Sequence, residues 1–319
     1  MTAATIVNIY GQDDSFWPVY GGADAGSAGV YLGQDQVKGL FDTPTRTFWA
    51  QGAHQSGGTM KAQWDEIRDI SLGFHVLKGS SGRATEDILS RFRRAFDYRE
   101  DPWDHDARLA RIEVITDRSG TRCLDVQLYE APDFNPGTDP IKAGYGNPIL
   151  PLRAGQPNWY QDDVITSWST TATSGSGTIT VSNPTDQPMK QKWIITRGDW
   201  TLPDVSWEGA PGVRVPGVDK LRGRDDRDRM ILMPTLGAIQ GGATVDLDTD
   251  KELMVRDAHD TNLLGQMPVP GRYFLYVIPP YTPDTELPVS VTGAPGGGVG
   301  AMVQLVQPRR WSSCMGLEL

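Results

Sequence analysis

Residues 111–130 read RIEVITDRSGTRCLDVQLYE and carry a clear hairpin signal. The runs at 111–116 and 122–130 alternate apolar and polar side chains, and the turn DRSG lies between them at 117–120. Two alternating runs around a glycine-containing turn are typical of paired antiparallel strands. We therefore expect an antiparallel hairpin here, within a first half of the chain that mixes strands with one main helix.

The segment before this hairpin predicts a helix over residues 85–97. Thr85 is the expected N-cap, and Glu86 and Asp87 place negative charge in the first turn, where the helix dipole favours it. The apolar side chains recur at helical spacing in one stripe, which consists of Ile88, Leu89, Phe92 and Phe96. The basic side chains that lie off this stripe, on the expected outer face, are Arg91, Arg93 and Arg94.

Arginines mixed with aromatic side chains, as in this helix, also occur in nucleic-acid-binding proteins. Residues 85–101 hold four arginines and five acidic side chains, so their net charge is −1. The whole chain of 319 residues has 30 basic and 40 acidic side chains and a net charge of −10. A surface that follows phosphates needs an excess of positive charge. We therefore expect no specific nucleic-acid binding.

The second half of the chain reads as a series of short strands. From about residue 163 onward, apolar runs are separated by clusters of Gly, Pro, Asn and Asp, and no helix is expected. The clearest runs are GTITVSN (177–183), QKWIITR (191–197), RYFLYVI (272–278) and AMVQLVQP (301–308). Short strands at fairly even spacing predict a β-sandwich. We place the domains at 1–158 and 159–319.

The sequence does not assemble an active site. The four histidines form no HExxH pattern, and the serines in GSSGR (79–83) and SGSGT (174–178) lack the GxSxG nucleophile pattern. Cys123 and Cys314 are too few for a disulfide framework or a cysteine zinc site. We therefore predict no catalytic residue, no cofactor and no metal. The longest apolar run, near residues 273–281, is too short to cross a bilayer, so no membrane insertion is expected.

Two sets of residues in the second half are candidates for surface contacts. The segment RGRDDRDR (222–229) alternates in charge and reads either as a solvated, salt-bridged loop or as a subunit contact through Arg224 and Asp225. Trp200 and Trp207 flank loop sequence that contains proline, and they are the candidates for an exposed aromatic surface. Exposed aromatic rings of this kind are suited to stacking against sugars.

Several segments in a fixed order resemble one protein family. They are ILSRFRRAFDYRED (88–101), RIEVITDRSGTRCLDVQLYEAPDF (111–134), NPILPLRAGQPNWYQDD (147–163), VSNPTDQPMKQKWIIT (181–196) and QPRRW (307–311). In this order they resemble the distal tail proteins of long-tailed phages, called minor tail proteins in phages of actinobacteria. Two parts depart from the family: residues 11–65 are longer and richer in glycine than its opening hairpins, and residues 209–228 look like an insertion.

The resemblance implies a fold and a role. The fold is an N-terminal β domain with a helix, followed by a galectin-like β-sandwich. The N-terminal domains of this family close into a homohexameric ring at the tail tip, which joins the tail tube protein to baseplate hub and tail-fibre proteins. The resemblance thus implies a structural virion protein without enzymatic turnover, assembled in the host cytoplasm. The candidates for contacts with neighbouring subunits are the helix arginines and, in the second half, Arg224 and Asp225.

Two other functions compete with this interpretation. A carbohydrate-binding sandwich would contact the host cell surface through Trp200 or Trp207. A cell-wall hydrolase would need a pair of catalytic carboxylates or a histidine-bearing metal site, and the sequence pattern indicates neither.

Overall fold

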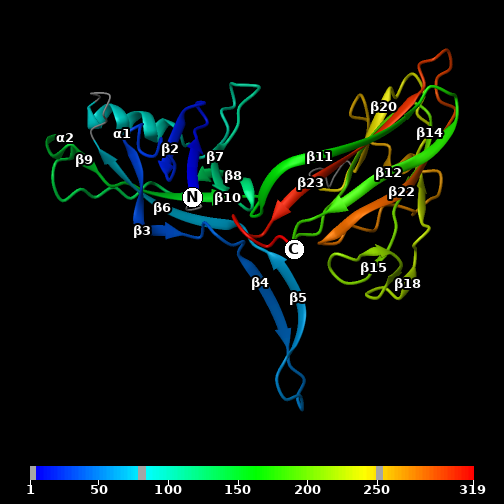
Figure 1. Cartoon of the computed structure of the whole chain (residues 1–319), viewed down its shortest axis with the longest axis horizontal. Coiled ribbons are helices and arrows are strands. Elements are labelled where there is room, and N and C mark those ends of the chain that lie inside the picture. The colour runs from blue at the N-terminus through cyan, green and yellow to red at the C-terminus, as the bar shows by residue number, and fades with distance from the viewer. Residues whose placement is uncertain (1–4, 78–83, 249–253) are drawn as a thin grey trace. The chain divides into compact units, whose positions relative to one another are not determined.

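The computed structural model describes residues 5–77, 84–248 and 254–319, and its fold is mainly β, as the sequence predicts. The chain folds as two compact units (Figure 1). Unit 1 comprises Met1–Gln161 and Trp311–Leu317, and unit 2 comprises Asp162–Arg310 and Glu318–Leu319. The last strand therefore leads the chain out of unit 2 and returns it to unit 1.

Unit 1 is built on two sheets of antiparallel strands that share β8. The first sheet has the order β2 (Phe16–Tyr20), β1 (Ile6–Tyr10), β7 (Ala110–Thr116) and β8 (Gly120–Leu128). The second contains β3 (Val30–Lys38), β6 (Arg68–Leu77), β9 (Tyr145–Gly146) and β10 (Ile149–Ala154), and β10 pairs with β8. Strands β7 and β8 form the hairpin predicted from residues 111–130, with Ile112 opposite Leu124.

Helix α1 (Thr85–Arg94) packs its apolar stripe into the core of unit 1. The Phe92 ring meets the Trp17 and Phe74 rings edge-on, with centroids 5.1 and 4.8 Å away. The predicted N-cap is wrong. Ala84 takes the extended backbone of a cap, at φ −64° and ψ 147°, so Thr85 is the first helical residue and its side chain is buried. The helix also ends at Arg94, three residues before the predicted end.

Unit 2 consists of two main antiparallel sheets around one hydrophobic core. One sheet contains the later part of β11 (Trp159–Thr170), then β23 (Ala301–Trp311), β13 (Lys192–Thr196), β20 (Gly242–Asp246) and β21 (Val255–Asp257). The other contains β12 (Gly175–Asn183), β22 (Thr282–Thr292), β14 (Asp199–Pro203) and β19 (Met230–Leu232). Both sheets contribute to the core, Trp193 and Leu305 from the first and Trp200 and Val289 from the second.

Several short elements complete the two units. In unit 2, β15 (Trp207–Glu208) pairs with β16 (Val215–Pro216), and β17 (Val218–Asp219) pairs with β18 (Arg224–Asp225). A short 3-10 helix there, η1, spans Leu264–Gln266. In unit 1, the additional elements are the short helix α2 (Pro140–Ala143) and the paired strands β4 (Thr45–Ala50) and β5 (Thr59–Asp65). Almost all side chains of these last two strands are exposed.

The segment RYFLYVI at 272–278 does not form the predicted strand. Its side chains alternate between core and solvent as in a strand, but within the described residues it pairs with no strand and forms only an isolated bridge between Met189 and Ile278. Side chains satisfy its backbone instead. The Asp204 carboxylate accepts from the Leu275 and Tyr276 N–H groups at 2.9 and 3.0 Å. The prediction failed because alternation reports which side chains are buried, not what the backbone pairs with.

Candidate assembly surfaces

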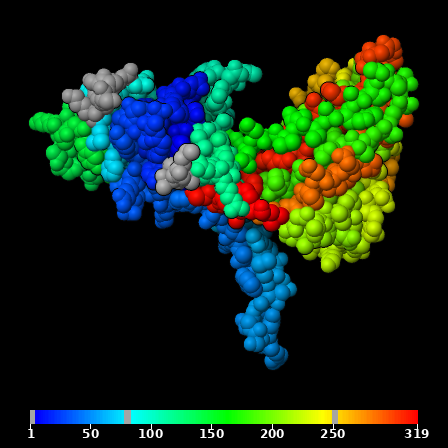
Figure 2. Space-filling view, in the orientation of Figure 1, coloured from blue at the N-terminus to red at the C-terminus, as the bar shows by residue number. Residues whose placement is uncertain are grey.

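Strands β4 and β5, with the loop at 51–58, form a two-stranded arm that carries large apolar side chains in solvent. Among the strands of the described chain these two pair only with one another, and almost all of their side chains are exposed. Phe48 and Trp49 are 56% and 58% exposed. Figures 1 and 2 show the arm extending away from the sheets of unit 1. A cluster of exposed large apolar side chains typically marks a contact surface.

The register of the arm puts aromatic side chains on both of its faces. Arg46 lies opposite Trp64, and its guanidinium carbon is 5.8 Å from the centroid of that ring. On the other face Trp49 lies opposite Met60, and the Trp49 indole N–H donates to the Thr47 hydroxyl at 3.1 Å. The two faces carry alternate side chains, because successive residues of a strand point to opposite sides. The arm can therefore bury apolar surface on either face.

The base of the arm is fixed to unit 1 by buried polar contacts. The Thr43 N–H donates to the Ser312 carbonyl at 2.7 Å, and Arg68 Nη2 donates to the Thr43 hydroxyl at 2.6 Å. On the return strand the Glu66 N–H donates to the Pro44 carbonyl at 2.8 Å. Arg68 and Thr43 are both buried, so the bond between them is shielded from water. The direction in which the arm leaves unit 1 is set by this cluster.

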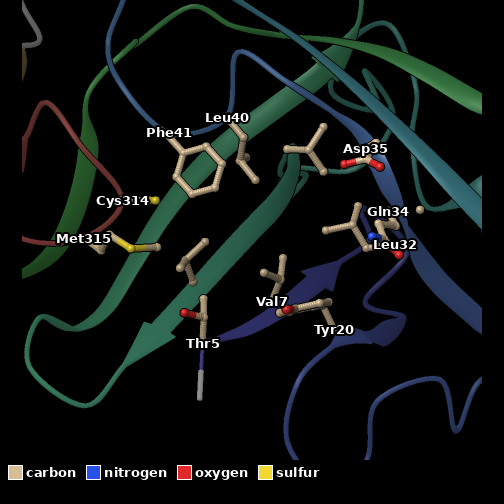
Figure 3. A pocket seen from close by; sticks show the side chains of 13 residues that line it. Thr5, Val7, Tyr20, Leu32, Gln34, Asp35, Leu40, Phe41, Cys314 and Met315 are labelled. Atoms are coloured by element: carbon tan, nitrogen blue, oxygen red, sulfur yellow. The ribbon is translucent and has the colours of Figure 1, made fainter. Parts of the chain in front are cut away.

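Unit 1 also contains an apolar pocket of about 470 Å³. Figure 3 shows side chains from β1, β3 and the returning C-terminal segment converging on it. Its buried walls come from Val7, Leu40, Val114 and Cys314, and its mouth is bordered by the half-exposed rings of Tyr20 and Phe41. Among the described residues that line the pocket, Asp35 has the one carboxylate, and it is exposed.

The chemistry of this pocket suits apolar binding rather than catalysis. Burial raises the pKa of the Cys314 thiol to about 11, so the sulfur stays protonated near neutral pH and is a poor nucleophile. No histidine or lysine lies among the described lining residues to act as a base. The pocket is therefore suited to binding an apolar side chain, and it has one acidic group at its edge.

The structure places the helix arginines on the surface of unit 1. Arg93 and Arg94 are exposed at the end of α1, while Arg91 is half-buried with its guanidinium carbon 5.5 Å from the centroid of the Trp17 ring. The outward orientation of Arg93 and Arg94 agrees with the sequence pattern. Their role as subunit contacts stays a prediction.

The charged segment 222–229 forms ion pairs within unit 2. Arg224 Nε lies 3.4 Å from the Asp226 carboxylate, and Arg227 Nε lies 2.8 Å from that of Asp225. Arg229 pairs with the buried Asp204 at 2.8 Å. These internal pairs favour the interpretation of a salt-bridged loop. A subunit contact through Arg224 and Asp225 also stays a prediction.

Trp200 is not a surface residue, and the prediction that it offers a stacking face was wrong. Its side chain is 0% exposed, and its indole N–H donates to the Thr196 carbonyl at 2.8 Å. Alternation along β14 turns Trp200 inward, where its ring meets that of Trp168 edge-on at 6.2 Å between centroids. Trp207 is half-buried and packs against the same core. The Trp200 ring therefore does not present the open face that the sugar-binding interpretation needs.

The described residues show no metal cluster and no nucleophile elbow among the other sequence candidates. There, no group of three or more His, Cys, Asp or Glu side chains is close enough to hold a metal ion. The serine segment at 174–178 lies almost wholly within β12 and is not followed by a helix, so it is no nucleophile elbow. The segment at 79–83 lies outside the described residues. No helix in the described chain is long and apolar enough to cross a membrane.

Sequence reasoning missed both the arm and the pocket. The arm had a usable signal, since RTFWA and TMKAQWD are aromatic-containing runs on either side of a glycine-containing loop. The pocket had no such signal, because its walls come from distant parts of the chain. These parts are residues 5–41, Val114 and the segment at 314–315.

The chain has relatives along its whole length among curated proteins. The minor tail protein Gp27 of Mycobacterium phage D29 is 26% identical in an alignment of 355 positions, which covers 100% of both chains. The minor tail protein Gp27 of Mycobacterium phage L5 has the same identity and coverage. No family model matches the chain. The full-length matches confirm the resemblance to phage minor tail proteins that the ordered segments between 88 and 311 indicated.

Solved structures offer weaker likenesses. The Dit protein (gp 19.1) of phage SPP1 is 11% identical with a TM-score of 0.46, and the match covers 87% of this chain and 93% of that one. A chain of the phage P2 baseplate in its activated conformation with Ca is 13% identical with a TM-score of 0.45, covering 97% and 98%. Likenesses of this size carry no argument about function.

Proposed function

We propose that this chain, a full-length homologue of the mycobacteriophage minor tail proteins, is a structural component of a phage tail. The observation that carries the proposal is the match to both relatives over 100% of each chain. A match over the whole length includes both units, so the proposal does not depend on one shared domain.

Within the tail, we propose that six copies of the chain form a ring at the tail tip. This ring would join the tail tube to baseplate hub and fibre proteins. Unit 1 would form the ring and unit 2 would be a galectin-like sandwich that faces the neighbouring proteins. Unit 1 supports this role through exposed apolar surface on the arm and an open apolar pocket, features that suit repeated subunit contacts. The net charge of −10 also suits a ring through which DNA passes without binding.

The role is structural, so we assign no reaction to the chain. The sugar-binding alternative loses its main support with the burial of Trp200. No observation in unit 2 favours it over the tail role.

The experiment that tests the ring is a mass measurement on the purified full chain by native mass spectrometry, across a range of concentrations. A hexamer has about six times the monomer mass of 35.0 kDa, or about 210 kDa. Negative-stain images of the same sample should show rings with six-fold symmetry. A monomer at every concentration, both alone and with the tail tube protein of the same phage, would contradict the ring. Absence of the chain from purified virions would contradict the tail role itself.

A further inference from the structure

We propose that the arm of one copy of this chain binds in the unit 1 pocket of a second copy. The inference rests on the ring proposed above, for which it names the contact between neighbouring subunits. The donor surface is the arm at 45–65, with its exposed Phe48, Trp49 and Met60 side chains. The acceptor is the apolar pocket between Val7, Leu40 and Met315.

The arm needs another surface to pack against its exposed apolar side chains. An isolated two-stranded hairpin is marginally stable at best in water, because two strands cannot bury a hydrophobic face between them. The arm nevertheless has a defined register from Thr45 opposite Asp65 to Ala50 opposite Thr59. Its aromatic side chains gain their burial only if another surface packs against them. Binding therefore stabilises both the contact and the fold of the arm.

The arm cannot reach the pocket of its own chain. Phe41 borders that pocket, and β4 begins at Thr45, so only residues 42–44 separate the two. These residues are fixed, since Asp42 forms a bridge with Ser313 and the Thr43 N–H donates to the Ser312 carbonyl at 2.7 Å. A turn of the arm back into the pocket would break this buried cluster. An arm that fills this pocket must then come from another molecule.

Charge favours a second copy of this chain as that molecule. The arm at 45–65 has two basic side chains, Arg46 and Lys61, and one acidic side chain, Asp65, although the chain as a whole carries −10. Arg46 pairs with Glu66 at 3.2 Å, so Lys61 supplies the positive charge beyond the base of the arm. Lys61 is exposed on the arm, and the mouth of the pocket carries the exposed carboxylate of Asp35. An apolar arm with the positive charge of Lys61 thus meets an apolar pocket with the negative charge of Asp35. Such a match steers two copies toward one another despite their like net charges.

The geometry of such a contact leads to a ring. The arm and the pocket are different surfaces of one unit, so their contact is head-to-tail and leaves one free arm and one free pocket in every open oligomer. Head-to-tail contacts of this kind form closed rings when the rotation between copies closes, whereas a two-fold dimer uses the same surface on both partners. The arm and pocket therefore provide what a ring-forming unit requires.

The test uses the purified full chain and variants that remove one surface each. The arm-minus variant replaces residues 46–64 with Asn-Gly, a dipeptide suited to a two-residue hairpin turn. The pocket-blocked variant is Phe41→Glu, which puts a charge at a half-exposed position on the mouth and leaves the core intact. The matched control is Trp103→Glu, because Trp103 is 93% exposed in unit 1 and lies outside both surfaces. Thermal unfolding confirms that each variant is folded.

The wild type and Trp103→Glu should assemble equally, while each surface variant alone should remain monomeric. A mixture of the two surface variants should give a 1:1 complex that grows no further, since it holds one usable arm and one usable pocket. The single change Trp49→Ala should weaken assembly by about 30-fold, the effect of truncating an aromatic residue that dominates an interface. Lys61→Glu and Asp35→Lys should each weaken assembly, and together they should restore part of it.

The outcomes separate this contact from the ring itself. A wild-type ring with normal assembly of the arm-minus variant would leave the proposed function standing and overturn the arm–pocket contact. The contact is also overturned if the two folded surface variants stay monomeric when mixed. A wild type that is monomeric under all conditions overturns the ring and this contact together. If the arm-minus variant forms normal rings that fail to bind the tail tube protein, the arm contacts that protein instead, and the arm–pocket contact is overturned.

Discussion

The guanidinium carbon of Arg122 lies 3.8 Å from the centroid of the Trp311 ring, and this stacked pair holds the C-terminal segment in unit 1. Arg122 Nη1 donates to the Ser313 carbonyl and Nη2 to the Gly316 carbonyl, both at 2.8 Å. Arg122 is 0% exposed, so its charge is satisfied by these carbonyls and by the indole ring rather than by water. Because the same segment supplies Cys314 and Met315 to the pocket, the pair also shapes the proposed subunit contact.

Removal of this guanidinium should destabilise unit 1 and free its last segment. We expect Arg122→Ala to lower the free energy of unfolding by about 3 kcal/mol, because one buried and one partly buried carbonyl lose charged donors. Hydrogen exchange of residues 312–317 should speed up in the same variant. The control is Arg93→Ala, an exposed arginine whose loss should cost less than about 0.5 kcal/mol. Equal stabilities for the two variants would show that the C-terminal segment is held in another way.

The phenol of Tyr276 should make unit 2 sensitive to alkaline pH. Its hydroxyl donates to the Asp226 carboxylate at 2.6 Å, and burial, followed by this bond, raises the pKa of Tyr276 to about 12. An unfolded tyrosine has a pKa near 10. The folded protein therefore keeps the Tyr276 proton to a higher pH than the unfolded chain does. The stabilisation from the Tyr276–Asp226 hydrogen bond is complete below about pH 10 and is lost as the pH rises toward 12.

The measurement compares the wild type with Tyr276→Phe in denaturant unfolding between neutral pH and pH 12. The difference in stability between the two proteins should shrink across the window from about 10 to about 12, because only the wild type has this proton to lose. A tyrosinate absorbance titration should show one fewer late-titrating phenol in the variant. A constant stability difference throughout the window would contradict the raised pKa.

Local patterns predicted the elements that local interactions decide. The β7–β8 hairpin and the stripe through Ile88 and Phe92 were readable because alternation and helical spacing record which side chains face the core. The predicted N-cap, Thr85, was wrong by one residue, because the extended backbone at Ala84 decides where the helix begins.

Features that depend on distant partners could not be predicted in the same way. The return of Trp311–Leu317 to unit 1 depends on Arg68 and Arg122, which bind carbonyls at 312, 313 and 316. The exposure of the arm depends on the absence of a third strand beside β4 and β5 in the described chain. The sequence shows apolar runs in both cases, and it does not show what packs against them.

Trp200 should behave as a core residue in mutation experiments. We expect Trp200→Ala to lower the stability of unit 2 by about 3–5 kcal/mol, the usual cost of a large cavity. The matched control is Trp103→Ala, an exposed tryptophan whose loss should change stability by less than about 0.5 kcal/mol. Sugar binding lost in Trp200→Ala would then report unfolding and not a stacking site. A stable Trp200→Ala variant would mean that the ring is not packed as described.

The helix arginines can be tested as subunit contacts independently of the arm. Arg93 and Arg94 are exposed at the end of α1, so the double change Arg93→Glu with Arg94→Glu should leave folding intact. If acidic groups of a neighbouring copy bind them, charge reversal should weaken assembly by more than tenfold and chiefly slow association, since surface charges act on encounter rates. The control is Arg99→Glu with Arg108→Glu, which changes the net charge equally at two other exposed positions of unit 1. Equal assembly of the two double variants, measured by light scattering at low and high salt, would assign Arg93 and Arg94 to solvation alone.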